Sequence, residues 1–214
     1  MTDRFDQLAA IREAFDARAG DYDENAMHRA LAMSVARFAR VPDDGTVVDA
    51  ATGTGLVARA LLARCPGLHI TGVDISPGML AVARTAEPRL DWIEADATTL
   101  PLDDASVDLV TCVTALHLFA EPEHAIAEWA RVLRPGGRVV TATFVSGGHH
   151  GKSHAEHSSA QHPAAVPFPR DHASFATPDR LQSLFAPVGL RIDRLATWVR
   201  ADDRVLIAEA VRAD

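Results

Sequence analysis

The residues with the clearest chemical content lie between Val47 and Ala58, in the stretch VVDAATGTGLVA. Gly53 and Gly55 lack a Cβ, so the backbone there can adopt positive φ and a ligand can approach the main chain closely. Asp74 follows at about the twenty-residue interval at which an acid binds the hydroxyls of a ribose. Because the two glycines and Ala58 also spell G-x-G-x-x-A, the pattern predicts a site for an adenosine cofactor and leaves a nicotinamide dinucleotide open.

Two further acids narrow the class of cofactor. Asp49 comes directly before the turn, where a carboxylate would lie unfavourably near a pyrophosphate but can attract an α-amino group. Asp96 stands at the end of a predicted strand in EADATTLPLDDASVD, where its carboxylate or a neighbouring amide can receive an adenine amino group. These acids disfavour a dinucleotide, and an NAD(P)-dependent oxidoreductase stays the alternative.

Strands and helices must hold these residues, and they alternate along the middle of the chain. The apolar patterns predict strands at 46–50, 68–74, 90–96, 107–116 and 137–145, and helices at 56–64, after Ser76, at 122–133 and after Thr177. Such alternation gives a parallel sheet with helices on both faces. Two last strands, 190–199 and 204–212, lie too close for a crossover and must pair antiparallel. The prediction is one doubly wound α/β sheet of seven strands, mostly parallel, that ends in a C-terminal hairpin.

The segments outside this core carry different patterns. Apolar residues at spacings of three and four predict a helix over 3–18, and a second helix runs from Ala30 to Phe38 after a polar connector. We expect residues 1–40 to form a helical lid. Residues 146–172 are rich in Gly, Ser, His, Ala and Pro without periodicity, which predicts a flexible insertion rather than a second domain. The last part, 177–212, holds a helix and the hairpin.

Composition limits the partners and the compartment. A formal charge of −8 and a pI near 5.6 argue against a nucleic-acid partner, because such surfaces neutralise phosphates. Two cysteines, Cys65 and Cys112, are too few for a disulfide framework and indicate a reducing compartment. The charged N-terminal sequence has no apolar signal core, and no apolar run reaches the length of a membrane span. We expect a cytoplasmic protein, monomeric or homodimeric, that acts on a small molecule.

Four motifs occur in order between Val47 and Phe144: VVDAATGTG, VDISPGML, EADATTLPL with SVDLV, and RVLRPGGRVV. In this order they resemble the class I S-adenosylmethionine-dependent methyltransferases. The N-terminal FDARAGDYD, together with Ala51 where the family usually has glycine, resembles the ubiquinone and menaquinone C-methyltransferase branch. The resemblance implies a single Rossmann-like methyltransferase domain over residues 1–214, S-adenosyl-L-methionine as cofactor, and O-, C- or N-methylation of a small-molecule acceptor. Residues 46–145 would be its cofactor-binding core.

The same resemblance implies roles for individual residues. The turn, including Ala51, Thr52, Gly53 and Gly55, would lie against the methionine part of the cofactor, with Asp49 facing its amino group. The other implied contacts are Asp74 with the ribose, Ile75 and Met79 beside the adenine, Asp96 and Ala97 at its amino edge, Thr114 beside the methyl group, and Tyr22 at the methionine carboxylate.

His117 is the predicted general base, because it follows the fourth strand, whose carboxyl end should face the methyl group. A histidine that only lines the cleft is the alternative. We expect no metal site among the histidines of the insertion (His149, His150, His154, His157, His162 and His172), since their spacing suits none. A non-catalytic cofactor-binding or interaction protein remains a further alternative.

Overall fold

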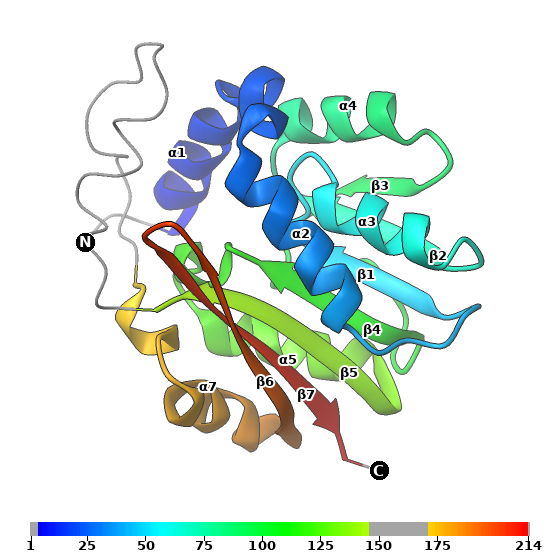
Figure 1. The fold of residues 1–214 in the computed structure, drawn as a ribbon, viewed down its shortest axis with the longest axis vertical. Helices are drawn as coiled ribbons and strands as arrows, with labels where there is room; N and C mark the ends of the chain where they lie inside the picture. Colours follow the sequence, from blue (N-terminus) through cyan, green and yellow to red (C-terminus); the bar gives the residue numbers. More distant parts are fainter. Residues whose placement is uncertain (1–3, 146–170, 214) are drawn as a thin grey trace.

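A seven-stranded sheet forms the centre of the computed structural model, which describes residues 4–145 and 171–213 (Figure 1). The strands are β1 (Thr46–Ala50), β2 (His69–Asp74), β3 (Asp91–Glu94), β4 (Val107–Val113), β5 (Leu133–Phe144), β6 (Leu190–Arg200) and β7 (Asp203–Arg212). Their spatial order is β3-β2-β1-β4-β5-β7-β6. The first five strands are parallel, whereas β7 is antiparallel to both β5 and β6. The predicted sheet and its C-terminal hairpin are confirmed.

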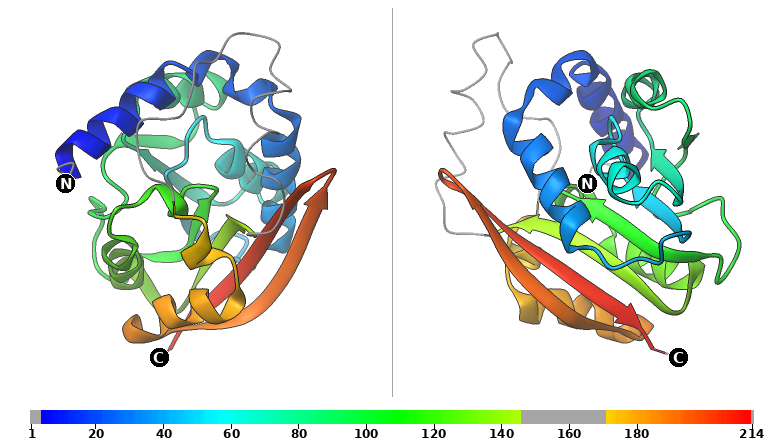
Figure 2. Two further views of the ribbon diagram at one scale, coloured as in Figure 1. Left: turned by 90° about the vertical axis from the view of Figure 1, so that its left-hand side faces the viewer. Right: turned by 45° about the vertical axis from the view of Figure 1, so that its right-hand side comes forward.

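Helices cover both faces of the sheet, as Figures 1 and 2 show. They are α1 (Arg4–Asp16), α2 (Ala26–Phe38), α3 (Leu56–Arg64), α4 (Pro77–Ala86), α5 (Pro122–Val132) and α7 (Pro178–Phe185), with short 3-10 helices η1 (Ala19–Glu24), η2 (Leu116–Leu118), η3 (Ala173–Phe175) and η4 (Ala186–Val188). One hydrophobic cluster joins α2, α3 and α4 to one face of the sheet, and a second joins α5 and α7 to the other. Burial on both faces explains the apolar character of β1.

Some predicted boundaries are wrong, and side-chain caps account for the largest shift. Helix α2 begins at Ala26 rather than Ala30, because the Asn25 side chain accepts hydrogen bonds from the first-turn N–H groups of Met27 and His28. The predicted polar connector before it is largely the 3-10 helix η1, and α1 ends at Asp16. The predicted caps Ser76 and Thr177 are confirmed, each with a proline at the first helical position.

The strands near the site also differ from the prediction in length. β4 ends at Val113 rather than at residue 116, because Thr114 has φ of 54° and breaks the extended conformation. β3 is limited to Asp91–Glu94, and β5 begins earlier, at Leu133. The predicted insertion, 146–172, lies outside the described residues except for its last two. Among the described helices, none is long and apolar enough to cross a membrane.

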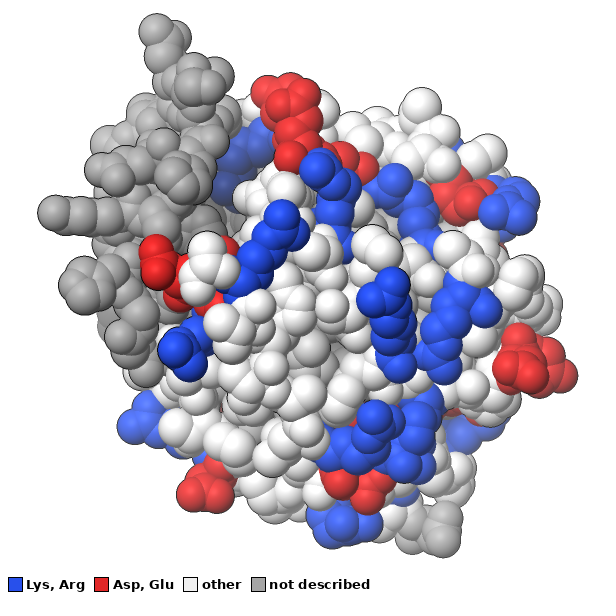
Figure 3. Space-filling model, viewed as in Figure 1, with Lys and Arg blue, Asp and Glu red and all other residues white. Residues whose placement is uncertain are grey.

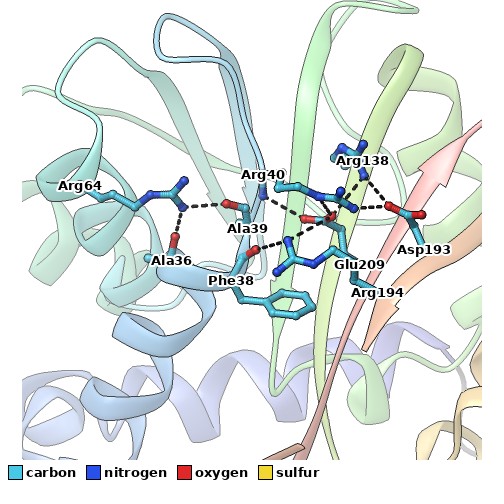
Figure 4. A network of polar contacts seen from close by, with 9 residues as sticks. All are labelled: Ala36, Phe38, Ala39, Arg40, Arg64, Arg138, Asp193, Arg194 and Glu209. Carbon is cyan, nitrogen blue, oxygen red and sulfur yellow. Dashed lines mark hydrogen bonds and ion pairs between the residues drawn. The ribbon is translucent and has the colours of Figure 1, made fainter. Parts of the chain in front are cut away.

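The surface charge is uneven although the net charge is −8. On the face seen in Figure 3, basic side chains gather over α2, α3 and the β6–β7 hairpin. Many of them have a structural partner, which Figure 4 shows. Arg64 donates to the carbonyl of Ala39 at 2.7 Å, and Arg194 donates to that of Phe38 at 3.0 Å. These arginines supply the donors that the last turn of a helix needs, so they fix the C-terminal end of α2.

Buried Glu209 on β7 ties the same end of α2 to the sheet (Figure 4). The backbone N–H of Arg40 donates to its carboxylate at 2.9 Å, and the guanidinium of Arg138 donates at 3.1 Å. Arg40 also forms an ion pair with it through Nε. This network therefore fixes the C-terminal end of α2 relative to the sheet.

Candidate cofactor site

A cavity lies where the parallel strands end, and it holds about 1170 Å³ of space when its open mouth is included. Residues of α1, η1 and α2 form one side of it, and the segments that follow β1, β2, β3 and β4 form the other. Carboxyl ends of parallel strands are the usual place for ligands in open α/β sheets. The predicted site residues that line this cavity are Tyr22, Asp49, Ala51, Thr52, Gly53, Asp74, Ile75, Asp96, Ala97 and Thr114.

Asp49 is almost fully enclosed at the end of β1, with 2% of its surface exposed. Its two carboxylate oxygens accept hydrogen bonds from the hydroxyls of Thr52 (2.5 Å) and Thr111 (2.6 Å). Burial raises the pKa of Asp49 to about 6, because the hydroxyls only partly replace the lost hydration of the charged form. A cation bound in the cavity would favour the ionised carboxylate.

This raised pKa predicts a pH-dependent stability. The folded protein binds the Asp49 proton more tightly than the unfolded chain, so the stabilisation is present at low pH and is lost as pH rises through about 6. Between about pH 4 and about pH 7 the free energy of unfolding should fall by about 2 kcal/mol relative to Asp49→Asn, which cannot titrate there. Urea titrations of both proteins across that range measure the difference. A constant difference would show that burial of Asp49 carries no such cost.

Asp74, at the end of β2, holds the turn in place. Its Oδ2 accepts the N–H of Gly53 at 2.8 Å, and its Oδ1 accepts the N–H of Ser76 at 2.9 Å. Each carboxylate oxygen can accept a further hydrogen bond, so the group can hold the turn and two ligand hydroxyls together. Burial raises the pKa of Asp74 above its ordinary value, and the two backbone N–H groups oppose that rise.

The turn itself has the predicted left-handed conformation at Gly53, where φ is 58°. A Cβ built on Gly53 would meet no atom within 4 Å, and the residue lines the cavity, so a ligand has room beside this backbone. The N–H of Thr52 donates to the carbonyl of Val73 at 3.0 Å, which links the start of the turn to β2. The turn is therefore anchored on both strands that flank it.

Ala51 also has positive φ, 53°, although it carries a Cβ. For an L-residue this conformation costs about 1–2 kcal/mol, whereas glycine adopts it freely. We expect Ala51→Gly to raise the free energy of unfolding by up to about 1 kcal/mol, since relief of strain exceeds the entropy that glycine adds to the unfolded chain. Ala50→Gly, on the adjoining strand, should lower it instead. Chemical denaturation of both variants checks the opposite signs.

Asp96 and Ala97 follow β3 on the far side of the cavity from the turn. The Oδ1 of Asp96 accepts the N–H of Thr98 at 2.9 Å, which orients the carboxylate at the start of this loop. The carbonyl of Ala97 accepts the indole N–H of Trp129 at 3.1 Å. Because Trp129 is fully buried on α5, the loop that carries Asp96 is attached to the core.

Three predicted site residues are placed elsewhere, and Gly55 is the first. A Cβ on Gly55 would lie 2.3 Å from the Trp92 ring, and the residue is not among those that line the cavity. The absent side chain of Gly55 therefore makes room for Trp92 on β3 rather than for a cofactor. A Cβ built on Gly72 of β2 would lie 2.4 Å from the same ring. No short-range pattern relates these glycines to Trp92, which explains why the sequence did not reveal this packing.

Met79 and His117 are the other two predicted site residues that do not line the cavity. Met79 is 0% exposed, so it presents no surface to an open cavity. The His117 ring stacks on His172 with centroids 4.1 Å apart and is not among the described residues that line the cavity. The 3-10 turn η2 is the reason: residues three apart share a face there, so Ala115 and Leu118 line the cavity while His117 points elsewhere.

The N-terminal segment covers the cavity and is anchored at several points. Asp16 at the end of α1 accepts hydrogen bonds from the Ser76 hydroxyl (2.6 Å) and the Gly78 N–H (2.8 Å) at the start of α4. Asp23 in η1 pairs with Arg59 on α3 and accepts the hydroxyl of Thr54. Both acids belong to the FDARAGDYD stretch, but their roles as anchors were not predicted. Leu8, Ile11 and Phe15 of α1 line the covered cavity.

Tyr22 lies on the inner side of this cover. Its ring stacks on that of His28, with centroids 4.7 Å apart, and its hydroxyl forms a hydrogen bond with the side chain of Thr114 at the end of β4. Burial raises the pKa of Tyr22 to about 12, so the hydroxyl stays protonated at neutral pH. His28, on the first turn of α2, also lines the cavity.

The charged side chains described in the cavity lining are all acidic. Among the described lining residues there are four acids, Asp49, Asp74, Asp96 and Glu121, and no lysine or arginine. Such a lining favours a cationic ligand and disfavours a pyrophosphate. Within residues 4–145 and 171–213, no group of three histidine, cysteine, aspartate or glutamate side chains is arranged to hold a metal ion. The histidines of the insertion, apart from His172, lie outside these ranges.

Comparison with known proteins shows which proteins this chain is similar to. Residues 48–141 match the family model described as a methyltransferase domain. The demethylmenaquinone methyltransferase of Thermus thermophilus is 45% identical over 102 residues, which cover 46% of this chain and 46% of the relative. That of Deinococcus radiodurans is 37% identical over 154 residues, with 66% of this chain and 63% of the relative covered. The chain thus spans about half the length of the curated relatives it matches.

Among solved structures, a methyltransferase of Haloferax volcanii in complex with the Trm112 activator has a TM-score of 0.71 and 26% identity. The match covers 94% of this chain and 98% of that one. The fold, the order of the motifs and the sequence similarity are those of the class I S-adenosylmethionine-dependent methyltransferases, which this chain resembles. Among them, the similarity is to the branch of the ubiquinone and menaquinone C-methyltransferases.

Proposed function

We propose that this protein binds S-adenosyl-L-methionine in the cavity and transfers its methyl group to a small-molecule acceptor. The acidic lining carries the proposal, because the sulfonium and the α-amino group make this cofactor cationic. The same lining argues against an NAD(P)-dependent oxidoreductase, whose cofactor would bring a pyrophosphate next to Asp49 and Asp74 without a lysine or arginine among the described lining residues. We propose a single domain over 1–214, with 1–40 as its lid.

The residues present fit the parts of this cofactor. Asp74 would accept hydrogen bonds from the ribose hydroxyls, and Gly53 would leave room for the methionine part beside the turn. Asp49 would attract the amino group through its negative charge, while its two oxygens also accept the threonine hydroxyls. The remaining proposed contacts are Ala51 and Thr52 at the turn, Ile75, Asp96 and Ala97 around the adenine, Thr114 near the methyl group, and Tyr22 at the methionine carboxylate.

Positioning would supply much of the rate. When bound, S-adenosyl-L-methionine provides a methyl group that is already activated for in-line displacement. The chain would hold it at the end of β4 and exclude water with the apolar side chains of α1, namely Leu8, Ile11 and Phe15. The anchors Asp16 and Asp23 keep this cover in place. The relatives are demethylmenaquinone methyltransferases, so we propose a flat, apolar acceptor of that kind.

Calorimetry tests the cofactor directly. Titration of the full chain with S-adenosyl-L-methionine, S-adenosylhomocysteine and NAD+ should give binding for the first two compounds and none for NAD+. Binding of NAD+ alone would refute the proposal. A screen for transfer of labelled methyl groups to quinols and other metabolites then tests the acceptor. Tight cofactor binding without transfer to any compound would favour a non-catalytic binding protein instead. The cytoplasmic location and the monomeric or dimeric state stay predictions.

A further inference from the structure

The cavity contains a histidine that is better placed for proton transfer than His117. His28 lines the cavity from the first turn of α2, whereas His117 lies against His172 and Phe144. Its ring is held parallel to that of Tyr22, at an interplanar angle of 23°. Tyr22 and His28 line the same cavity as Thr114, the residue at the carboxyl end of β4 that is proposed to face the methyl group.

The other ionisable groups near this end have structural or cofactor-binding roles. Tyr22 stays protonated because burial raises its pKa to about 12, so its hydroxyl is a donor rather than a base. The oxygens of Asp49 accept two threonine hydroxyls, and those of Asp74 hold backbone N–H groups of the turn and of α4. Imidazole is the side chain whose ordinary pKa suits proton transfer near neutral pH.

The surroundings of His28 also indicate the kind of acceptor. Leu31 and Ala32 of α2 and Leu56 and Val57 of α3 line the cavity with it. This apolar wall, next to an aromatic pair and without a described lysine or arginine in the lining, suits an uncharged aromatic molecule. An anionic acceptor would meet the acids of the cavity instead.

We propose that His28 accepts the proton of the methyl acceptor, a neutral aromatic compound with a weakly acidic O–H group. The O–H bond breaks and its proton goes to an imidazole nitrogen of His28. The electron pair left on the acceptor forms the new bond to the methyl carbon, while the sulfur–carbon bond breaks and its electron pair stays on sulfur. This inference rests on the proposed methyl transfer.

A chromogenic phenol tests the step without knowledge of the natural acceptor. 4-Nitrophenol absorbs differently as phenol and as phenolate, so the full chain saturated with S-adenosylhomocysteine can be titrated with it below its pKa in water. We expect bound nitrophenol to become largely phenolate in the wild type. His28→Asn should reduce the phenolate fraction at least about tenfold while the affinity for S-adenosylhomocysteine stays within about twofold. His28→Gln, a longer neutral substitution, should act in the same way.

Control variants distinguish a failure of the His28 inference from a failure of the proposed function. His124→Asn, on the exposed surface of α5, and His117→Asn should both behave like the wild type. The charged groups around the aromatic pair are Arg18, Asp23 and Asp74, and all variants leave them unchanged. A phenolate signal that survives His28→Asn, one that only His117→Asn removes, or an absence of nitrophenol binding would each overturn the inference. Failure to bind S-adenosylhomocysteine at all would instead refute the proposed function.

Turnover provides the second readout once an acceptor is found. His28→Asn should lower kcat at least about tenfold, because general-base catalysis typically contributes a hundredfold or more. The dissociation constant of S-adenosyl-L-methionine should change little, since none of the cofactor contacts proposed above is made by His28. An unchanged kcat would show that His28 only forms part of the wall.

Discussion

Asp74→Ala is expected to weaken binding of S-adenosyl-L-methionine by at least about tenfold, or about 1.5–3 kcal/mol, the usual loss for a hydrogen bond to a charged group. The reason is that one carboxylate has two tasks. It holds the N–H groups of Gly53 and Ser76, and it would also accept the ribose hydroxyls. Removal therefore takes away a ligand contact and loosens the turn that the ligand lies against. Isothermal titration calorimetry measures the change.

Two comparisons make this result specific. Asp91→Ala removes an exposed acid at the start of β3 and should leave the affinity unchanged. Asp74→Asn keeps the shape but loses the charge and one acceptor, so it should lie between the wild type and Asp74→Ala. Thermal unfolding of the ligand-free variants shows whether the fold is intact. If a folded Asp74→Ala protein bound the cofactor as tightly as the wild type, the carboxylate would have no place in the site.

Gly55→Ala is expected to lower the free energy of unfolding by about 3 kcal/mol. Two costs add at this position. The left-handed backbone, φ 80°, is unfavourable for alanine by about 1–2 kcal/mol. The new methyl group would also lie 2.3 Å from the Trp92 ring, and forced repacking of a core side chain costs about 1–3 kcal/mol. Urea denaturation followed by circular dichroism measures the total.

Gly53→Ala is the matched control, because it shares the turn and the positive φ but meets no atom within 4 Å. It should lose only the backbone contribution, about 1–2 kcal/mol. Gly55→Ala combined with Trp92→Leu should then show coupling, since the smaller side chain relieves the clash. Equal losses in Gly53→Ala and Gly55→Ala, with no coupling to Trp92, would mean that Trp92 does not determine the glycine at this position.

Much of the fold was predictable because its signals are local. The runs of apolar residues and their spacing identified all seven strands, and the short link between the last two required an antiparallel pair. Ser76 and Thr177 could be recognised as caps because each contacts an N–H group only three residues away. The start of α2 was missed, although Asn25 acts in the same way, since nothing in the pattern distinguished Asn25 from the other polar residues around it.

For the site, the sequence predicted the residues at the strand ends better than the directions of individual side chains. Asp49, Gly53, Asp74 and Asp96 could be placed at one edge of the sheet because each lies at or just after the carboxyl end of a parallel strand, and parallel strands end together. Strand order and direction are enough for that inference. They do not predict the direction of an individual side chain beyond the end of a strand, as the position of His117 shows. One 3-10 turn after β4 moves its ring away from the cavity.

By itself, the sequence determined the class of fold, the edge of the sheet that carries the site and three of the four acids that line it, since these follow from local periodicity and from chain direction. The tertiary structure alone decided that Gly55 makes room for Trp92 and that His28 rather than His117 lies in the cavity. It also decided that Asp16 and Asp23 hold the cover. These outcomes depend on contacts between residues far apart in the chain, whose geometry is set only when the elements pack together.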